Sequence, residues 1–314
     1  MRISVYLLGS LAALAVAFLT PSPASTQTNQ SWETCIGATS MPDQRVKACS
    51  AVIDAKSETG DKLAAAYCNR GHGLTEKHEL DAALADLDEA IRIHPKYPCA
   101  FSNRGRVYTF KGDLNRAIAD YDHAIKLDPS FALAYNNRGD ARRKKGDVNE
   151  ALADFSSAIK LDPNLAIAYN NRGYVYYRQH ETARAIADYT RQIELTPDNM
   201  LAYISRGNVY RDSEQLDRAA ADYGKAITIA PTDARGWRNR GMIRLFKGDS
   251  RGGLQDYDKA LQYDPADAYS WNNRGQAKVR LGDKQGAIAD FRKALELRPD
   301  LPTTRESLRK LGAL

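Results

Sequence analysis

Apolar residues recur at spacings of three and four along most of this chain, a pattern that predicts amphipathic α-helices. In residues 132–165, Tyr135 and Gly139 share one helical face, and Ala151 and Phe155 share the face of a second helix. Each predicted helix is apolar on one side only. A single pair of helices cannot bury such faces alone, so the pairs must stack on their neighbours.

This pattern repeats with a fixed length of 34 residues. The triplet Asn-Arg-Gly, or a near copy, ends at glycines 34 positions apart, and a proline closes each copy at the same spacing. The glycines are Gly71, Gly105, Gly139, Gly173, Gly207, Gly241 and Gly275. Seven copies therefore follow one another as residues 64–97, 98–131, 132–165, 166–199, 200–233, 234–267 and 268–301.

A short turn separates the two helices of each copy. In the third copy it holds Gly146, which suits the left-handed residue that closes a helix, and Asp147, which suits the cap of the next. Three copies carry His78, His180 or Glu214 in place of this glycine. Those three turns are expected to be more strained, because a side chain disfavours the left-handed conformation.

The two ends of the chain depart from the repeat. Residues 1–24 contain a basic start and a long apolar run, which predicts an export signal; an uncleaved membrane anchor is the alternative. Residues 25–63 predict a degenerate leading helical hairpin, and residues 302–314 a last helix that caps the final repeat.

The length of 34, the small residue of the first helix, the Ala and aromatic residues of the second, and the closing Pro resemble the tetratricopeptide repeat. The resemblance covers seven copies in phase. It implies an all-α fold, a right-handed superhelix (α-solenoid) of helix pairs whose first helices line a concave groove. It also implies that the protein works by binding proteins or peptides rather than by catalysis.

An arginine precedes every triplet glycine, where this family usually has an apolar residue. A partly buried guanidinium requires a partner. Each second helix supplies an aspartate at a constant distance, so we predict seven Arg–Asp pairs, for example Arg138 with Asp154. The alternative is that these arginines line the groove and bind acidic ligands.

Four cysteines allow three disulfide pairings. A bond between Cys35 and Cys49 would join the two helices of the leading hairpin, and Cys68 with Cys99 would form a second bond between adjacent first helices. Disulfides persist outside the cytoplasm, which agrees with export. Four buried thiols are the alternative.

Composition and charge narrow the function classes. The chain is 43% hydrophobic and 27% charged, which excludes a disordered chain and a multi-span membrane protein. Its 45 Lys and Arg face 39 Asp and Glu, with both signs interleaved. Nucleic-acid binding requires clustered positive charge, so no nucleic-acid partner is expected.

Positions that vary between copies and face the expected groove are candidates for ligand contact. They combine aromatic and cationic side chains, which are common anchors of binding surfaces. The candidates are Phe110, Arg143, Lys144, Tyr174, Tyr177, Arg178, Arg211, Arg235, Arg238 and Phe246. They favour an extended, acidic peptide; a solvated face with incidental side chains is the alternative.

A row of asparagines stands two residues before the triplet glycines and is interrupted by Ser205. Its members are Asn69, Asn103, Asn137, Asn171, Asn239 and Asn273. The row is similar to the asparagine ladder in the repeat superhelix of O-GlcNAc transferase. Side-chain amides both donate and accept, so they can hold a peptide backbone; the alternative is that they bond neighbouring helices.

No sequence motif indicates catalysis, a metal or a cofactor. Residues 248–252 match the nucleophile-elbow pattern but fall on a turn between two helices, with no strand before them. The sequence thus predicts an exported, periplasmic or secreted, non-catalytic scaffold that binds a protein or an extended peptide. The alternative is a structural component of an envelope complex, acting by docking or self-association through its ends and outer face; the oligomeric state stays open.

Overall fold

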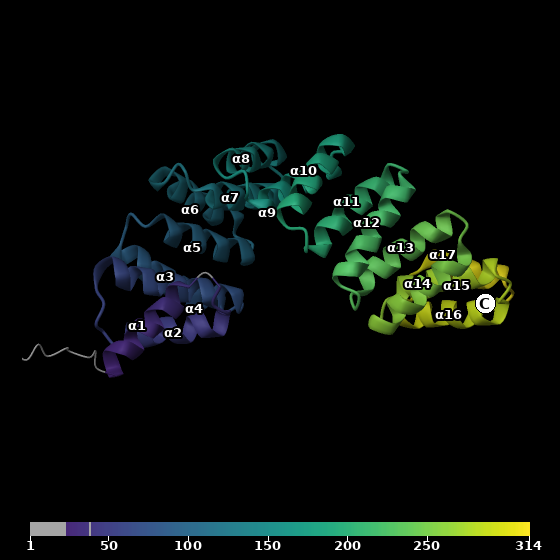
Figure 1. The fold of residues 1–314 in the computed structure, drawn as a ribbon, viewed down its shortest axis with the longest axis horizontal. Coiled ribbons are helices and arrows are strands. Elements are labelled where there is room, and N and C mark those ends of the chain that lie inside the picture. The colour runs from purple at the N-terminus through teal and green to yellow at the C-terminus, as the bar shows by residue number, and fades with distance from the viewer. Residues whose placement is uncertain (1–22, 38) are drawn as a thin grey trace, which may run out of the picture. The chain divides into compact units, whose positions relative to one another are not determined.

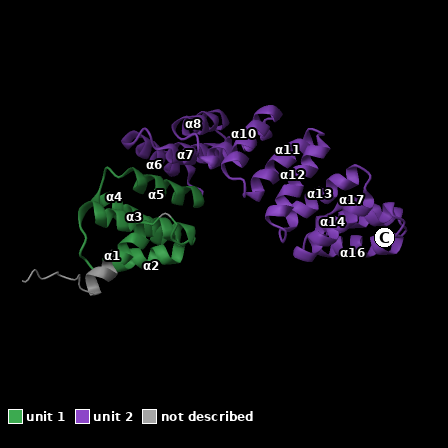
Figure 2. Cartoon of the chain, viewed as in Figure 1, with its two compact units in different colours: residues 1–111 green, residues 112–314 purple. Residues whose placement is uncertain are grey.

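The computed structural model describes residues 23–37 and 39–314 (Figure 1). The chain divides into two compact units: unit 1 ends at Lys111, and unit 2 comprises residues 112–314 (Figure 2). Within these residues the chain forms seventeen helices and no strand. The predicted fold class, an all-α repeat superhelix, is confirmed. Residues 1–22 of the predicted export signal lie outside the described residues.

Unit 1 holds five helices, and consecutive helices pack against each other. They are α1 (Pro23–Ile36), α2 (Pro42–Asp54), α3 (Gly60–Glu76), α4 (Leu80–Ile93) and α5 (Pro98–Phe110). In the hairpin of α1 and α2, the Cys35–Cys49 disulfide and Val52 are buried against Trp32 and Ile53.

Unit 2 holds twelve helices, and consecutive helices pack against each other. They are α6 (Leu114–Leu127), α7 (Ala132–Lys145), α8 (Val148–Leu161), α9 (Ala166–Arg178), α10 (Thr182–Leu195), α11 (Met200–Asp212), α12 (Leu216–Ile229), α13 (Ala234–Phe246), α14 (Ser250–Tyr263), α15 (Ala268–Arg280), α16 (Lys284–Leu297) and α17 (Pro302–Lys310). Helix α17 covers the end of the unit, where Leu308 packs on Phe291 and Thr304 donates a hydrogen bond to Asn272.

The turns between paired helices follow the sequence pattern. Gly146 has a φ of 101°, in the left-handed region, whereas His78, His180 and Glu214 adopt a φ of 60°. A side chain at such a φ is disfavoured, so the predicted strain at these three turns is confirmed. Of the four Gly-Asp turns, those with Asp113, Asp249 and Asp283 use the carboxylate as a helix cap. Asp147 makes no such bond.

Six triplet glycines, Gly71, Gly139, Gly173, Gly207, Gly241 and Gly275, permit close approach of the paired helix. A Cβ atom built on Gly139 would lie 2.8 Å from the ring of Phe155, and one on Gly275 would lie 2.7 Å from the ring of Phe291. These distances are shorter than van der Waals contact, so a larger residue would displace the buried aromatic ring.

Six of the seven predicted Arg–Asp pairs are present within the two units. In each, Nε and Nη2 of the arginine donate to the two carboxylate oxygens, at 2.6–3.0 Å. The pairs are Arg70–Asp86, Arg138–Asp154, Arg172–Asp188, Arg206–Asp222, Arg240–Asp256 and Arg274–Asp290. The seventh, Arg104 with Asp120, spans the two units and stays a prediction. The structural role is therefore the correct interpretation for these six arginines.

One of the two predicted disulfides is confirmed and the other is wrong. Cys35 and Cys49 are bonded, whereas Cys68 and Cys99 remain thiols. Cys68 is buried and accepts a hydrogen bond from Asn103 at 3.3 Å, while Cys99 is exposed. Their side chains thus occupy different environments, although both lie on adjacent first helices.

The reactivities of these two thiols are expected to differ. Burial raises the pKa of Cys68 to about 12, and the thiolate is the nucleophile that reacts with an alkylating agent. In native protein at pH 8, iodoacetamide should label Cys99 at least about tenfold faster than Cys68. Peptide mapping by mass spectrometry over time measures both rates, and equal rates would contradict the burial of Cys68. In denatured protein the rates should converge.

No helix in residues 23–37 and 39–314 has the length and apolar character that a membrane span requires.

Candidate functional site

Three successive first helices of unit 2 lie side by side. Helix α7 contacts α9, and α9 contacts α11, although a second helix lies between them in sequence. Side chains cross from one repeat to the next: Arg143 lies over the ring of Tyr174 at 5.2 Å, and Asn171 donates to Asn136 at 3.0 Å. We call the surface formed by α7, α9 and α11 the inner face of unit 2.

An aromatic and acidic pair joins α9 to α11. The hydroxyl of Tyr177 donates to Asp212, and Nε of Arg211 donates to the same carboxylate at 2.6 Å. Burial and the bond to Asp212 raise the pKa of Tyr177. Burial would raise the pKa of Asp212, but the bonds from Arg211 and Tyr177 hold it below its usual value. The group is therefore a neutral phenol, a carboxylate and a guanidinium in fixed positions.

The cationic side chains of the inner face outnumber its carboxylates. Asp140 accepts from Arg143 at 2.6 Å and from Lys144 at 2.9 Å. Arg178 and Arg211 bring the number of cations in this cluster to four, against the two carboxylates of Asp140 and Asp212. The cluster therefore carries a surplus of positive charge.

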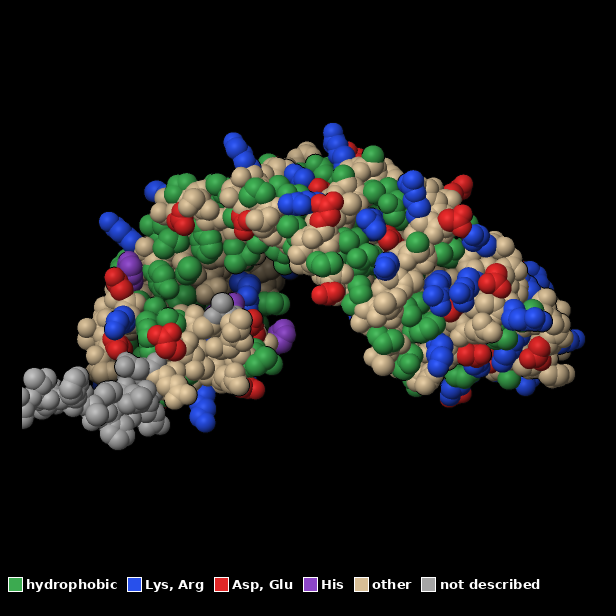
Figure 3. Space-filling view, in the orientation of Figure 1, with side chains coloured by type: hydrophobic (Ala, Val, Ile, Leu, Met, Phe, Trp, Pro, Cys, Tyr) green, Lys and Arg blue, Asp and Glu red, His purple; other side chains and the backbone are tan. Residues whose placement is uncertain are grey.

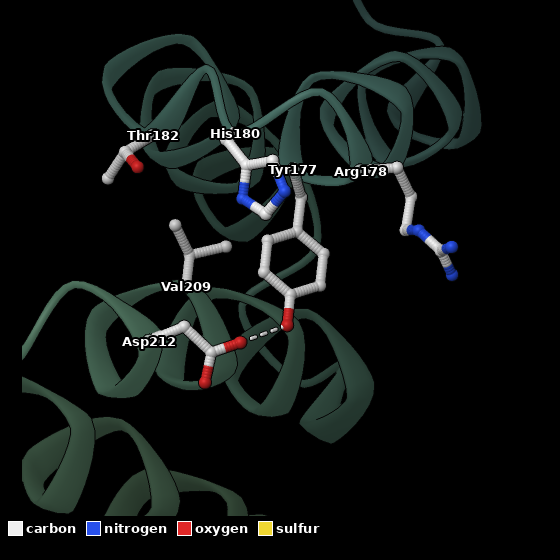
Figure 4. Close-up of a pocket in the computed structure, with 6 residues that line it drawn as sticks. All are labelled: Tyr177, Arg178, His180, Thr182, Val209 and Asp212. Atoms are coloured by element: carbon white, nitrogen blue, oxygen red, sulfur yellow. Dashed lines mark hydrogen bonds between the residues drawn. The ribbon is translucent and has the colours of Figure 1, made fainter.

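A pocket of about 530 Å³ lies where α9 ends and α10 begins (Figure 4). Six residues line it: Tyr177, Arg178, His180, Thr182, Val209 and Asp212. Figure 4 shows the Tyr177 ring reaching from α9 toward Asp212 on α11. The exposed guanidinium of Arg178 and the methyl groups of Val209 give the pocket both polar and apolar contacts.

The asparagine row has partners inside the protein. Asn171 bridges to Asn136 of the preceding repeat, Asn69 donates to the backbone of Ala65 at 2.9 Å, and Asn103 donates to Cys68. Asn137 and Asn273 each accept from the preceding asparagine, and Asn239 is buried. These hydrogen bonds occupy some of the side-chain amide donors and acceptors that a bound peptide backbone would use.

Three exposed aliphatic side chains were not among the sequence-based candidates. Leu133, Ile167 and Leu201 occupy the same position of three successive repeats, near the starts of α7, α9 and α11, and are 41–50% exposed. The signal was present in the sequence, because other copies have Ala65, Cys99, Arg235 or Tyr269 there. The inner face thus carries an apolar row beside its aromatic and cationic cluster.

The remaining candidates are not part of this cluster. Phe110 belongs to unit 1, where its ring packs against His78 at 5.5 Å. Arg235 and Arg238 lie on α13 and pair with Asp233 and Asp267, at 2.7 and 3.3 Å. Phe246, at the end of α13, is 64% exposed.

The described residues contain no group of three or more His, Cys, Asp or Glu side chains suited to hold a metal ion. The surface of Figure 3 shows acidic and basic side chains intermixed, with many Lys and Arg over the helices from α13 to α16.

Comparisons with known proteins point to one repeat family. A family model described as a TPR repeat matches residues 105–142 and 139–180, and models described as the tetratricopeptide repeat match residues 170–234 and 268–301. No curated protein sequence matches the chain.

Several solved structures share the fold. YrrB, described as a TPR protein with an unusual peptide-binding site, is 21% identical with a TM-score of 0.52; the match covers 60% of this chain and 97% of YrrB. PilF of Pseudomonas aeruginosa is 18% identical with a TM-score of 0.60, over 68% of this chain and 97% of PilF. The C-terminal part of a TPR repeat-containing protein from Cytophaga hutchinsonii is 17% identical with a TM-score of 0.61, over 77% of this chain and 99% of that one.

Proposed function

Since this chain is a tetratricopeptide-repeat protein, we propose that it is a non-catalytic scaffold that binds an acidic peptide segment of a partner protein on the inner face of unit 2. The observation that carries this proposal is the cluster of Arg143, Tyr174, Tyr177, Arg178 and Arg211, drawn from three successive repeats. Aromatic and arginine side chains in fixed positions supply contact area and charge at small entropic cost. The peptide-binding site named for YrrB agrees with such a role.

The inner face also offers a second kind of contact. Leu133, Ile167 and Leu201 form an apolar row along the same three helices. We propose that the ligand places apolar side chains on this row and acidic ones toward the cationic cluster. Asn137 and Asn171 lie on the same helices, and we assign them the smaller task of holding the ligand backbone.

Export is part of the proposal. The Cys35–Cys49 disulfide would persist outside the cytoplasm. It agrees with the predicted signal in residues 1–24, and on these two grounds we propose a periplasmic or secreted location.

Loss of two anchors is expected to weaken ligand binding. Peptides selected from a displayed library on the full chain should bind at least about tenfold more weakly to a Tyr174→Ala, Arg178→Ala variant, because both side chains contact the ligand directly. Fluorescence anisotropy or calorimetry measures the affinities.

The matched control removes one aromatic and one cationic residue elsewhere, as Tyr263→Ala with Lys160→Ala. Both residues are exposed on second helices, so this variant should bind like the wild type. An equal loss in both variants, or no loss in either, would show that the ligand binds elsewhere. A mass that rises with concentration in light scattering, without peptide binding, would favour the self-association alternative.

A further inference from the structure

Six of the seven triplet arginines make a hydrogen bond to the preceding repeat. In these six, Nη1 donates to an oxygen on the preceding second helix, and in five of them Nε and Nη2 bind the aspartate of the same repeat. The pairs are Arg70 with Ser50 (3.2 Å), Arg104 with Asp88 (2.7 Å), Arg138 with Asp122 (2.6 Å), Arg172 with Ser156 (3.2 Å), Arg206 with Thr190 (3.0 Å) and Arg274 with Asp258 (2.8 Å). The guanidinium thus joins two repeats.

Arg240 is the exception. The residue that stands 16 positions before it is Gly224, where five other copies have Asp88, Asp122, Ser156, Thr190 or Asp258. A Cβ atom built on Gly224 would lie 4.0 Å from Nη1 of Arg240. The space that an oxygen-bearing side chain fills in the other copies is therefore left open, and Nη1 faces it.

The charge around Arg240 is also unbalanced. Asp256, whose side chain is 2% exposed, binds both Arg240 and Arg244, at 2.7 and 3.0 Å. The next carboxylate, Asp249, lies 4.0 Å from Arg244, beyond hydrogen-bonding distance.

In two other copies, one buried aspartate also binds two cationic side chains, and a second carboxylate balances the additional positive charge. Arg138 and Arg142 share Asp154, and Arg274 and Lys278 share Asp290. In both, a second carboxylate, Asp122 or Asp258, binds the triplet arginine from the preceding repeat. Arg240 and Arg244 lack this second carboxylate.

A cavity of about 590 Å³ adjoins this position. Its lining includes Trp237, Arg240, Arg244, Asp258 and Lys259. The guanidinium of Arg240 lies over the Trp237 ring at 5.1 Å. Asp258 is engaged by Arg274, and Lys259 donates to Gln262 at 3.0 Å.

We propose that this cavity binds an acidic side chain of a partner protein, whose carboxylate takes the place beside Arg240 that Asp122 takes beside Arg138. The missing group is one carboxylate on one side chain, which is why an acidic protein segment fits the space. Trp237 supplies an apolar surface for the methylene groups that carry the carboxylate. The site lies on α13 and α14, apart from the inner face, and does not depend on the function proposed above.

The indole N–H of Trp237 reports on this cavity in a proton–nitrogen NMR spectrum. The probe is an N-acetylated hexaglutamate amide, with the hexaglutamine peptide as its uncharged counterpart. Hexaglutamate should shift the Trp237 signal in the wild type and in Gly224→Ala. The Trp271 signal should stay in place, because its neighbour Arg274 already holds Asp258.

A Gly224→Asp variant supplies the missing carboxylate within the chain, and its affinity for hexaglutamate should fall by about tenfold or more. A second variant, Gly224→Ser, copies the repeat with Ser156 and should lose less affinity for hexaglutamate. It provides the test if the aspartate variant does not fold. The proposal is overturned if Trp237 does not respond, if Trp271 moves equally, or if both polar variants bind like the wild type. A response to inorganic phosphate but not to hexaglutamate would overturn it in favour of a small-anion site.

Discussion

Replacing Asp154 with alanine is expected to lower the free energy of unfolding of unit 2 by about 3–5 kcal/mol, because it leaves a partly buried guanidinium group without its partner. The Asp154 side chain is 4% exposed and accepts hydrogen bonds from Nε and Nη2 of Arg138 and from Nη1 of Arg142. Arg138 keeps its hydrogen bond to Asp122 and its contact with the Tyr135 ring in the variant, and Arg142 loses its bond to Asp154. Both side chains, which are 15% and 23% exposed, would lose the carboxylate that balances their charge between α7 and α8.

Repeat arrays do not always unfold in one step, so the measurement must be local as well as global. Urea denaturation gives the total loss, and hydrogen exchange should show the largest loss of protection in α7 and α8. The matched control is Asp122→Ala, which removes the exposed partner of the same arginine and should cost less than about 1 kcal/mol. A double variant, Arg138→Met with Asp154→Leu, should recover part of the loss, since it removes the charges of Arg138 and Asp154 but leaves Arg142 without its carboxylate. An Asp154→Ala protein as stable as the control would contradict the role assigned to these pairs.

The fold could be predicted from the sequence because its determinants repeat. Three features recur every 34 residues: a triplet glycine in contact with an aromatic ring, an Arg–Asp pair and a closing proline. Each copy alone is a weak signal, but the seven copies support one another. The Arg–Asp pairs could be predicted because every copy has one such arginine and one aspartate at a constant separation, and a partly buried arginine requires an acidic partner.

The binding surface was harder to predict, because its contacts depend on side-chain direction. Cys68 and Cys99 lie on adjacent first helices, yet one thiol points into the core and the other to solvent. Asn137 and Asn171 were identified from their position in the repeat. The hydrogen bonds of their side-chain amides to neighbouring asparagines depend on distances between packed helices, which the spacing of residues in the sequence does not reveal.

Two features were present in the sequence and could have been found by comparing copies. Leu133, Ile167 and Leu201 share a position that is not aliphatic in the flanking copies. Gly224 is the only glycine at a position that holds Asp, Ser or Thr in five other copies. Departures from a repeat are informative because packing, which is common to all copies, does not explain them.

Removal of the Cys35–Cys49 disulfide is expected to destabilise the leading hairpin by about 3 kcal/mol, because the bond closes a short loop and restricts the unfolded chain. The two cysteines are 14 residues apart and fully buried between α1 and α2. A Cys35→Ala, Cys49→Ala variant should lose hydrogen-exchange protection in α1 and α2, while protection in unit 2 stays unchanged.

The control is Cys99→Ala, which removes an exposed thiol and should leave the stability of the hairpin within about 0.5 kcal/mol. Reduction of the wild type should reproduce the double variant, since both open the same loop. A hairpin that keeps its protection after reduction would mean that the buried contacts of Trp32, Val52 and Ile53 suffice. A peptide map of native protein that finds Cys35 and Cys49 as thiols would remove the disulfide, and with it the structural support for export.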